Sequence, residues 1–408
     1  MPLSLFMDIL FLLTQDLESP SGLGRYWPLA RELAALGHTV NITALHANFA
    51  ALTNRQIQRD GVTVNYVAQM HVQKTGSEKN YYSAPRLLAV SAQATLALTR
   101  AAWQSQADII HVCKPHPMNS VAGLLGRWRS RQPLFLDCDD LEAGSHFTGG
   151  WQKRGVVYFE EHMPLWADHL TTHNQTLENY LLGLGVPEQK ITYLPNGVDY
   201  QRFQEPPEEQ VAALRVQLGL NGRQVVTFIG TLSLVSHPVD LLLQAFARLY
   251  QENQNVRLLV VGGGESLPEL QALAARLHIE GAVIFTGRVA PEQIPLYYRL
   301  SDVIVDPVLD NPVARTRLPL KLFESWVSRV PFVCGDAGDR RRVLGDPPAG
   351  LLVPPGDPEA LADALWRVLT DAQLANQLVG LGVARAQNYD WHRLAQNLVQ
   401  TYEASLTF

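Results

Sequence analysis

The stretch DILFLLTQDLESPSGLGRYWPLARELAALGHTVNITAL, residues 8–45, decides the fold class of this chain. It begins with the continuous apolar run 8–13, which is typical of a strand covered on both faces. A turn-rich segment, residues 18–24, follows. Leucines and alanines then recur at helical spacing up to Gly37, which predicts the end of a helix. The residues 39–45 predict the next strand, and this order of strand, helix and strand predicts a parallel sheet with right-handed crossovers.

The same alternation continues along the chain and restarts after residue 200. Further strands are predicted at 108–112, 134–136, 225–229, 256–261, 283–286 and 331–334. Further helices are predicted at 84–104, 120–129, 238–250, 268–277, 320–328 and 358–369, the last with Asp357 as its N-cap. Glycine and proline gather between residues 183 and 200, which marks a linker. We therefore predict an α/β chain of two Rossmann-like βαβ domains, 1–187 and 188–385, that face each other across a ligand-binding cleft.

Composition and charge exclude several classes of protein. The chain has 408 residues, of which 47% are hydrophobic and 18% charged, so it is not a disordered, collagenous or mainly coiled-coil protein. Its formal net charge of −6 argues against a nucleic-acid partner. The three cysteines, Cys113, Cys138 and Cys334, cannot form a disulfide framework. Because the apolar segment 2–13 includes Asp8 and lacks a basic start, it does not resemble a signal peptide, and we expect a cytoplasmic protein.

The strongest signal for a ligand site lies between residues 310 and 342. Glu324 stands on a predicted helix after a loop, where a carboxylate suits the vicinal hydroxyls of a ribose and the N–H groups of the helix start suit a phosphate. Seven basic and three acidic residues stand between 315 and 342, so a net-acidic chain carries one basic stretch. Arg317 and Lys321, four residues apart, are predicted partners for a diphosphate. A helix face whose cations are only solvated is the alternative interpretation.

Seven motifs stand in order along the second half of the chain. They are YLPNGVD (193–199), FIGTLS (228–233), VDLLLQAFARL (239–249), LLVVGGG (258–264), VIFTGRV (283–289), LKLFES (320–325) and GLLVPPGDPEALADAL (350–365). This series resembles the donor-binding half of GT-B glycosyltransferases, specifically the retaining enzymes of family four, the glycosyl transferases group 1. LARELAALGHTV (29–40) resembles the N-terminal half of the same enzymes more loosely. YDW (389–391) resembles the start of their C-terminal helix, here 386–408, which packs back on the N-terminal domain.

The resemblance implies an activity and its requirements. The protein would transfer a sugar from a nucleotide diphosphate donor to a hydroxyl acceptor, with retention at the anomeric carbon. The acceptor would be a glycan, a lipid-linked molecule or a small molecule. No metal and no cofactor beyond the nucleotide sugar is implied, because basic side chains, helix-start amides and glycine loops would stabilise the leaving diphosphate. The N-terminal domain would bind the acceptor and the C-terminal domain the donor, and closure of the cleft would exclude water.

The resemblance also assigns donor-binding residues by position. Glu324 matches the second glutamate of the family's Glu-x7-Glu pair and would hold the ribose. Arg288 and Val289 match the loop that lies against the base. Gly22 and Gly24 match the N-terminal loop that lets the backbone approach the phosphates. The full donor-binding set is Glu324, Thr316, Arg317, Lys321, Leu322, Phe323, Gly230, Thr231, Arg288, Val289, Gly22 and Gly24.

Three positions depart from the family's pattern. Thr316 stands where the first glutamate of the pair is expected, which changes the contact with the donor sugar. Thr231 stands in place of an arginine, and residues 235–237 offer no lysine where one is usual. We hypothesise that Arg317 and Lys321 replace these two cations. The alternative is a degenerate homologue that binds a nucleotide or a glycan without transferring a sugar.

The catalytic, acceptor-side residues are predicted just after the strand at 134–136. Asp140 would orient an acceptor hydroxyl, and Asp139 stands where a histidine is common in the family. His116, after the preceding strand, points to the same edge, although a histidine next to proline is more often structural. A polar cluster whose carboxylates cap a turn is the alternative interpretation. Asp137 with Asp139 also matches the Asp-x-Asp signature of magnesium-dependent haloacid-dehalogenase-like phosphatases, which is a minor alternative.

One further patch is both basic and aromatic. It consists of Arg127, Trp128, Arg129 and Arg131. Such a patch predicts a weak peripheral contact with an anionic membrane if the acceptor is lipid-linked. Cations of a surface helix that are only solvated are the alternative interpretation.

Overall fold

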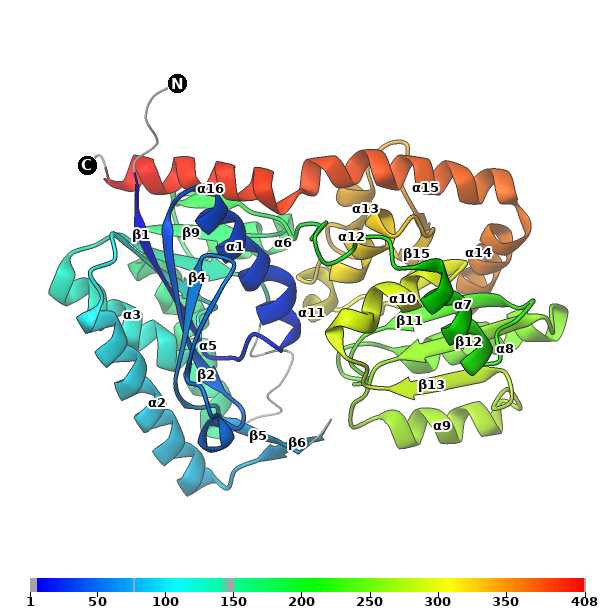
Figure 1. The fold of residues 1–408 in the computed structure, drawn as a ribbon, viewed down its shortest axis with the longest axis horizontal. Helices are drawn as coiled ribbons and strands as arrows, with labels where there is room; N and C mark the ends of the chain where they lie inside the picture. The colour runs from blue at the N-terminus through cyan, green and yellow to red at the C-terminus, as the bar shows by residue number, and fades with distance from the viewer. Residues whose placement is uncertain (1–5, 76–77, 142–143, 145–149, 407–408) are drawn as a thin grey trace. The chain divides into compact units, whose positions relative to one another are not determined.

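The computed structural model describes residues 6–75, 78–141, 144 and 150–406, which form two compact units (Figure 1). Unit 1 comprises Met1–Asn196 and Trp391–Phe408. Unit 2 comprises Gly197–Asp390. The chain first passes from unit 1 to unit 2 within the segment 183–200, in which glycine and proline predict a linker.

Unit 1 is built on an eight-stranded sheet in the order β10-β9-β8-β7-β1-β2-β4-β3. Its strands are β1 (Asp8–Leu13), β2 (Thr39–His46), β3 (Gln56–Arg59), β4 (Val62–Gln69), β7 (Ile109–Cys113), β8 (Leu134–Cys138), β9 (His169–Thr172) and β10 (Ile191–Tyr193). All neighbouring strands are parallel except β3 and β4, which pair antiparallel at one edge. A separate two-stranded ribbon consists of β5 (Val72–Thr75) and β6 (Glu78–Tyr81).

Helices cover both faces of this sheet. They are α1 (Trp27–Ala35), α2 (Ala84–Gln104), α3 (Pro117–Ser130), α5 (Gly150–Trp166), α6 (Gln175–Gly183) and α16 (Trp391–Leu406). Because side chains alternate between the faces of a strand, Phe11 of β1 packs with α1 and α16, whereas Leu10 and Leu12 pack with α2, α3 and α5. α16 is therefore part of the unit 1 core, and its Tyr402 hydroxyl lies 2.5 Å from Nδ1 of His111.

Unit 2 is built on a six-stranded parallel sheet in the order β13-β12-β11-β14-β15-β16. Its strands are β11 (Gln224–Ile229), β12 (Val256–Val261), β13 (Val283–Gly287), β14 (Val303–Asp306), β15 (Phe332–Gly335) and β16 (Leu351–Val353). Its helices are α7 (Glu208–Gln217), α8 (Val239–Glu252), α9 (Leu267–Arg276), α10 (Ile294–Arg299), α11 (Pro312–Arg315), α12 (Leu320–Val327), α13 (Arg340–Leu344), α14 (Pro358–Thr370) and α15 (Ala372–Ala386). The prediction of an α/β chain with two Rossmann-like units is confirmed.

Local sequence explains where individual helices begin. The Asp357 side chain accepts hydrogen bonds from the backbone N–H groups of Glu359 and Ala360, at 2.9 and 3.0 Å, and Pro358 opens α14. The predicted N-cap is therefore confirmed. α3 begins at Pro117, three residues before the predicted helix, because proline suits the first turn of a helix.

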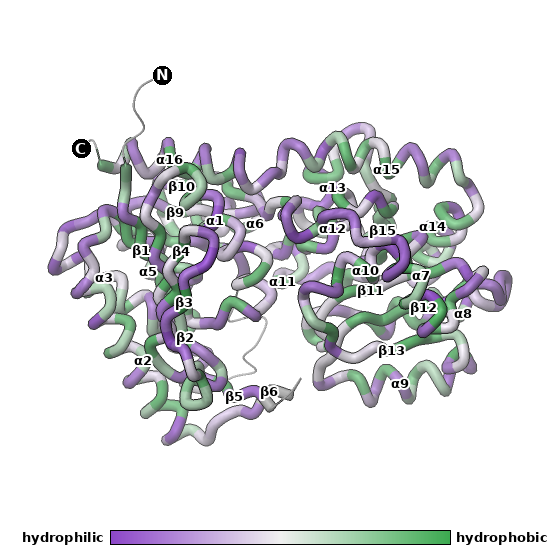
Figure 2. The backbone as a smooth tube through the Cα atoms, viewed as in Figure 1, coloured by the Kyte–Doolittle hydropathy of each residue, from purple (hydrophilic) through white to green (hydrophobic). Residues whose placement is uncertain are grey.

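Hydropathy follows the layers of the fold. Figure 2 shows hydrophobic and hydrophilic residues alternating along surface helices such as α2, α3 and α9, as expected of helices that pack one face on a core. The strands of unit 2 contribute Val226, Val260 and Val305 to the core on one face of its sheet. Within the described part of the chain, no helix is both long enough and apolar enough to span a bilayer.

Candidate functional site

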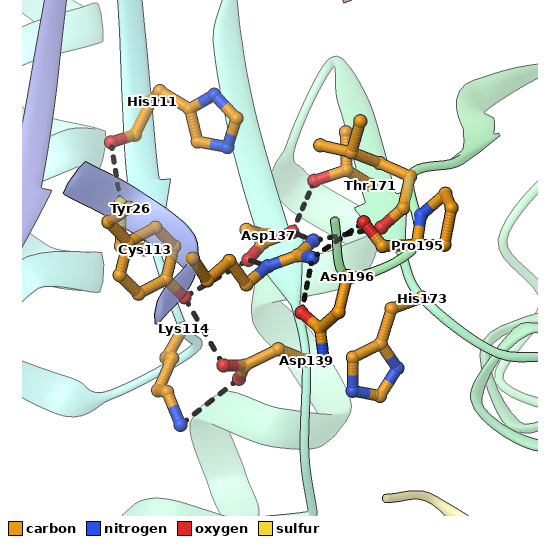
Figure 3. Close-up of polar contacts among 12 residues, drawn as sticks. Tyr26, His111, Cys113, Lys114, Asp137, Asp139, Thr171, His173, Pro195 and Asn196 are labelled. Carbon is orange, nitrogen blue, oxygen red and sulfur yellow. Dashed lines mark hydrogen bonds and ion pairs between the residues drawn. The ribbon is translucent and has the colours of Figure 1, made fainter. Parts of the chain in front are cut away.

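In unit 1, polar and charged side chains follow three neighbouring strands at the point where each strand ends (Figure 3). Lys114 follows β7, Asp139 and Asp140 follow β8, and His173 follows β9. Because these strands are parallel neighbours, their carboxyl ends meet at one edge of the sheet. The structure therefore brings the two predicted aspartates to the same edge as Lys114 and His173, which the sequence did not indicate.

The centre of this edge is a buried ion pair between Arg25 and Asp137 (Figure 3). Arg25 Nε and Nη2 donate to the two carboxylate oxygens of Asp137 at 2.8 and 2.6 Å, and both side chains are 2% exposed. The hydroxyls of Thr171 and Tyr26 donate to the same carboxylate at 2.6 and 3.0 Å. Burial alone would raise the pKa of Asp137, but the charge of Arg25 outweighs it and holds this pKa well below its usual range. Asp137 is thus a fixed, ionised carboxylate.

This ion pair argues against one alternative function. Both carboxylate oxygens of Asp137 are engaged by donors inside the protein, so Asp137 is not placed to attack a phosphate as the nucleophile of a phosphatase. Arg25 also donates to the carbonyl oxygens of Leu194 and Pro195 and to the Asn196 side chain. Through these hydrogen bonds Arg25, which precedes α1, holds its segment against the ends of β8 and β10. The structure does not support the phosphatase interpretation.

Lys114 joins the two aspartates predicted to face an acceptor. Its Nζ lies 3.1 Å from Oδ1 of Asp139 and 3.7 Å from Oδ2 of Asp140. Lys114 has a φ of +73°, in the left-handed region that non-glycine residues rarely adopt. Asp139 is buried, whereas Asp140 is half-buried. Asp140 is therefore the more accessible of the two carboxylates. Strained backbone conformations such as that of Lys114 are frequent at functional sites.

Two histidines near this edge differ in their surroundings. His116 is the N-cap residue of α3, and its ring stacks on that of His71 with 5.8 Å between ring centroids. His173 is buried, and its Nδ1 lies 2.9 Å from Nδ2 of Asn174. Burial, and then the positive charge of Arg25, lowers the pKa of His173 to about 3. The imidazole of His173 is therefore neutral near pH 7, which makes it a second candidate histidine beside the predicted His116.

The predicted glycine loop of unit 1 has a different structure. Gly22 and Gly24 lie in a π-helical turn, η1 (Gly22–Tyr26), which continues directly into α1, and both are buried. A Cβ atom on Gly22 would lie 2.4 Å from the carbonyl oxygen of Asp16, so the chain's packing against itself requires glycine there. The turn-rich segment predicted at residues 18–24 is therefore helical from Gly22 onward, which corrects that part of the prediction. π-Helical turns are frequent at functional sites.

In unit 2, two cations surround a buried acidic residue. Lys321 on α12 places its Nζ 2.7 Å from Oδ1 of Asp306, the last residue of β14. Arg340, the first residue of α13, donates to the other carboxylate oxygen at 3.0 Å. Burial alone would raise the pKa of Asp306, but the two cations hold this pKa well below its usual range. The three side chains together therefore carry a net positive charge.

The ends of β11 and β12 approach each other so closely that only glycine fits. A Cβ atom on Gly262 would lie 1.9 Å from the carbonyl oxygen of Gly230, and one on Gly264 would lie 2.2 Å from that of Leu232. A Cβ atom on Gly230 would lie 3.6 Å from Nζ of Lys321. The ammonium group of Lys321 therefore stands beside the predicted strand-end glycine.

Arg317 reaches the segment in which the family's usual lysine is absent. Its Nη1 donates to the carbonyl oxygen of Ser236 at 2.9 Å. The next residue, His237, is half-buried, and burial followed by the charge of Lys321 lowers its pKa well below the ordinary value. A neutral imidazole therefore stands near the two cations. That Arg317 and Lys321 replace the missing cations stays a prediction.

Glu324 lies on α12 and is half-buried. The Tyr298 hydroxyl donates to its Oε2 at 2.7 Å, and Nη1 of Arg202 lies 3.3 Å from its Oε1. Burial and then the charge of Glu324 raise the pKa of Tyr298 well above its ordinary value, so the phenol keeps its proton. A carboxylate offers about four lone-pair positions, so Glu324 retains acceptor capacity for hydroxyl groups. The sequence did not indicate Tyr298 or Arg202.

Three predicted donor contacts are buried side chains. Leu322 and Phe323 are fully buried in the core of unit 2, so only their backbone is available to a ligand. Thr316 is 1% exposed, and its hydroxyl donates to the carbonyl oxygen of Val313 at 3.1 Å. The role of these three positions in donor binding stays a prediction, and for Leu322 and Phe323 it would fall to the backbone.

The remaining predicted donor residues follow neighbouring strands. Thr231 comes after Gly230 at the end of β11, and Arg288 and Val289 come directly after β13. β12 lies between these two parallel strands, so all four residues share one edge of the sheet. Arg288 is exposed and Val289 is half-buried.

The basic stretch at residues 315–342 is less positive in the structure than in the sequence. Further ion pairs join Arg315 to Asp310, Arg341 to Asp336 and Arg342 to Asp339. Asp306 and Asp310 stand outside the stretch and neutralise part of its charge.

Comparisons with known proteins cover both units. Residues 21–197 match the model of the glycosyl transferase 4-like domain, and residues 223–371 match that of glycosyl transferases group 1. D-inositol 3-phosphate glycosyltransferase of Nocardia farcinica is 30% identical over 59% of this chain and 53% of its own length. GDP-mannose-dependent alpha-(1-6)-phosphatidylinositol monomannoside mannosyltransferase of Mycolicibacterium smegmatis is 30% identical over 53% of this chain and 58% of its own length. The chain thus spans little more than half the length of these relatives.

Solved structures share the fold over nearly the whole chain. Sucrose-phosphate synthase of Thermosynechococcus elongatus has a TM-score of 0.76 at 19% identity, with 98% of both chains covered. HepE of Anabaena in complex with UDP-glucose has a TM-score of 0.74 at 20% identity, with 98% of this chain and 100% of that chain covered. With both family models matched in order along one chain of this fold, the protein belongs to the GT-B glycosyltransferases of the glycosyl transferases group 1 family.

Proposed function

We propose that this protein transfers a sugar from a nucleotide diphosphate sugar to a hydroxyl acceptor. HepE was solved with UDP-glucose, and the relative from M. smegmatis is named as GDP-mannose-dependent. These names support a nucleotide sugar as the donor, with uridine and guanosine as the first bases to test.

Unit 2 would hold the diphosphate of the donor. The observation that carries this assignment is the position of Lys321 Nζ beside Gly230, at the carboxyl edge of the parallel sheet. A ligand of this fold class binds at that edge, and a diphosphate needs positive charge there. Lys321 and Arg340 together exceed the charge of Asp306, and Arg317 adds a further cation.

The rest of the donor would bind around the same edge. Glu324 would accept hydrogen bonds from the ribose hydroxyls, with its orientation fixed by Tyr298 and Arg202. Arg288 and Val289 would lie against the base. Thr231 would meet the phosphates from the turn after β11.

The chemical step would depend on electrostatic stabilisation. The acceptor oxygen forms a bond to the anomeric carbon on the face from which the diphosphate departs, and it passes its proton to the departing diphosphate oxygen. The bond from that carbon to the diphosphate oxygen breaks, and negative charge develops on the leaving group. Lys321 is held by Asp306 and Arg317 by Ser236, so both cations are oriented before a substrate binds and need little reorganisation. We infer that the reaction proceeds with retention and requires no metal or other cofactor.

Unit 1 would bind the acceptor. Asp140 is the more accessible aspartate at its sheet edge, and Lys114 keeps it and Asp139 together. Asp140 would orient the acceptor hydroxyl, with His116 at the same edge. The names of the relatives make an inositol phosphate and a phosphatidylinositol mannoside the first acceptors to test.

The state of the cysteines supports a reducing compartment such as the cytoplasm. Cys113, Cys138 and Cys334 are all buried and unbridged. Structural disulfides are rare where thiols are kept reduced.

A panel of UDP- and GDP-sugars tests the proposal. We expect one nucleotide diphosphate to raise the melting temperature, because a ligand that binds the native state stabilises it. We then expect its sugar to be consumed when D-inositol 3-phosphate or another hydroxyl acceptor is added, with an α-linked product from an α-linked donor by NMR and with no effect of a chelator. Binding without turnover across all acceptors would favour the non-catalytic homologue, and no binding at all would overturn the donor site.

A further inference from the structure

Three helices on one face of the unit 1 sheet carry an unusual number of exposed aromatic side chains. α2, α3 and α5 pack against the same core, and we refer to them as the α2–α3–α5 layer. The indole N–H of Trp103 on α2 donates to the carbonyl oxygen of Leu125 on α3 at 2.9 Å. Nη1 of Arg127 on α3 donates to the carbonyl oxygen of Trp166 on α5 at 2.6 Å. These two contacts join α2 to α3 and α3 to α5, so the three helices are neighbours.

All the exposed tryptophans of the described chain lie on this layer. They are Trp103, Trp128, Trp151 and Trp166, and Trp128 is 75% exposed. Leu96 on α2 is 70% exposed. Four exposed indoles on one layer of helices require an explanation, because large apolar side chains gathered at the surface mark an interaction site.

The same surface is positively charged. Exposed or half-buried cations of the layer are Arg86, Arg100, Arg127, Arg129, Arg131, Lys153 and Arg154. α2 and α3 contain no acidic residue, and of the two on α5, Glu160 is buried and Glu161 is exposed. The layer is thus strongly basic in a chain whose net charge is −6.

An open groove of about 440 Å³ runs along α5 within this surface. Its lining consists of the cations Lys153 and Arg154, the apolar or aromatic Val157 and Tyr158, and Gly150 and Glu161. Cations beside apolar side chains match an anionic amphiphile, whose headgroup needs positive charge and whose chain needs an apolar contact.

We propose that the α2–α3–α5 layer binds the surface of a bilayer that contains anionic phospholipids. Tryptophan suits the boundary between headgroups and acyl chains, because its ring is apolar and its N–H is polar. The arginines and lysines would meet the negative surface potential of the lipid. The proposal does not depend on the glycosyltransferase activity.

A second copy of the chain fits this surface less well. In a symmetric dimer the same patch occupies both sides of the interface, so the cations of one layer would face the cations of the other. Like charges in such an interface repel each other. An anionic bilayer offers the headgroup boundary to the aromatic side chains and negative charge to the basic side chains.

Flotation of the full chain with vesicles tests the proposal. We expect binding to phosphatidylcholine vesicles that contain about 30% phosphatidylglycerol, little binding to pure phosphatidylcholine, and release as salt screens the charges. The intrinsic tryptophan fluorescence should shift to shorter wavelength, and brominated lipids should quench it. This readout reports the exposed indoles directly.

Two variants and two matched controls locate the surface. Arg100→Glu/Arg129→Glu should lower the partition coefficient about tenfold or more, whereas Arg276→Glu/Arg367→Glu in unit 2, with the same change in charge, should leave it unchanged. Leu96→Ser/Trp128→Ser should weaken binding and fluorescence quenching, whereas Val216→Ser/Val235→Ser, at exposed positions of unit 2, should not.

Three results would overturn the proposal. The wild-type protein could fail to bind anionic vesicles. The layer variants could bind as well as the wild type, or the unit 2 controls could lose binding equally. Lastly, light scattering could show a dimer that Leu96→Ser/Trp128→Ser dissociates, without lipid binding, which would assign the surface to a second copy.

Discussion

The ammonium group of Lys321 lies 2.7 Å from the carboxylate of Asp306, so a predicted ligand contact is also one half of a buried ion pair. Arg340 binds the other oxygen of the same carboxylate at 3.0 Å. The charge of Asp306 is therefore shared by two cations, and neither is fully neutralised. Because Arg340 balances part of the negative charge of Asp306, Lys321 keeps positive charge that can attract a diphosphate.

Lys321→Met should weaken the binding of the nucleotide diphosphate by about 10- to 100-fold, the effect of losing a charged hydrogen bond of about 1.5–3 kcal/mol. Calorimetric titration measures this at a temperature at which the variant is folded. Arg315→Met is the control, because Arg315 belongs to the same basic stretch but forms an exposed ion pair with Asp310. Equal affinities of Lys321→Met and the wild type would contradict the donor site.

Asp140→Asn should lower the rate of sugar transfer about tenfold or more, as expected when a group that orients or deprotonates a nucleophile is removed. The affinity for the nucleotide should not change, because the predicted donor residues other than Gly22 and Gly24 belong to unit 2. Steady-state kinetics and titration with the nucleotide separate the two effects. Asp60→Asn, on an exposed turn, is the control. A parallel loss of nucleotide affinity would argue against a role on the acceptor side.

His173 and His111 should make the protein less stable as the pH falls below about 6.5. Burial lowers the pKa of His173 to about 3 and that of His111 to about 4. An unfolded histidine has a pKa of about 6.5, so below this pH the unfolded state binds more protons than the folded state. The free energy of unfolding then falls by about 1.4 kcal/mol per pH unit for each such histidine until its folded pKa is reached.

His173→Asn should make this dependence on pH shallower. Urea unfolding between pH 7 and pH 5 measures the slope. His278→Asn is the control, because His278 is exposed at a turn of unit 2. If His173→Asn and the wild type lose stability equally over this range, His173 is not buried in its neutral form.

Asp137→Asn should destabilise unit 1 by about 3–5 kcal/mol, because it leaves the buried guanidinium of Arg25 without its counter-charge. Thermal unfolding monitored by circular dichroism measures the loss. Asp336→Asn removes the partner of the exposed Arg341 and should cost less than about 1 kcal/mol. Similar melting temperatures for the two variants would mean that the Arg25–Asp137 pair is accessible to solvent.

Gly262→Ala should destabilise unit 2 by about 1–3 kcal/mol or prevent its folding, because the new Cβ would meet the carbonyl oxygen of Gly230. Gly281→Ala is the matched control, since a Cβ there would have no neighbour within 4 Å. A melting temperature of Gly262→Ala equal to that of the control would show that the turns after β11 and β12 can separate without cost.

Long periodic segments of the sequence predicted their elements well. The predicted helix 84–104 coincides with α2, and the predicted strands 8–13 and 256–261 coincide with β1 and β12. In each of these segments the apolar residues follow the pattern of one kind of element over its whole length. β10 and β16, in contrast, have three residues each, which is too short for a period to be recognised.

The candidate site could be predicted only in part, for a physical reason. Asp139 and Asp140 could be found because they directly follow an apolar strand, and the ends of parallel strands share one edge. Arg25 could not be paired with Asp137, because the two stand 112 positions apart in the chain. Arg202 and Glu324 stand 122 positions apart, and nothing in the local sequence of either indicates the other. Ion pairs of this kind are properties of the tertiary structure.

The membership of α16 in unit 1 has a consequence for how the protein is made. The core of unit 1 includes Leu398 and Tyr402 of α16, which reach the ribosome exit only after the whole of unit 2 has been synthesised. Unit 2 is continuous in sequence and can complete its core first. The half of the protein that is translated earliest is therefore the last to be completed. A fragment that stops at Asn196 would leave the side of its sheet that carries α1 and α16 only partly covered.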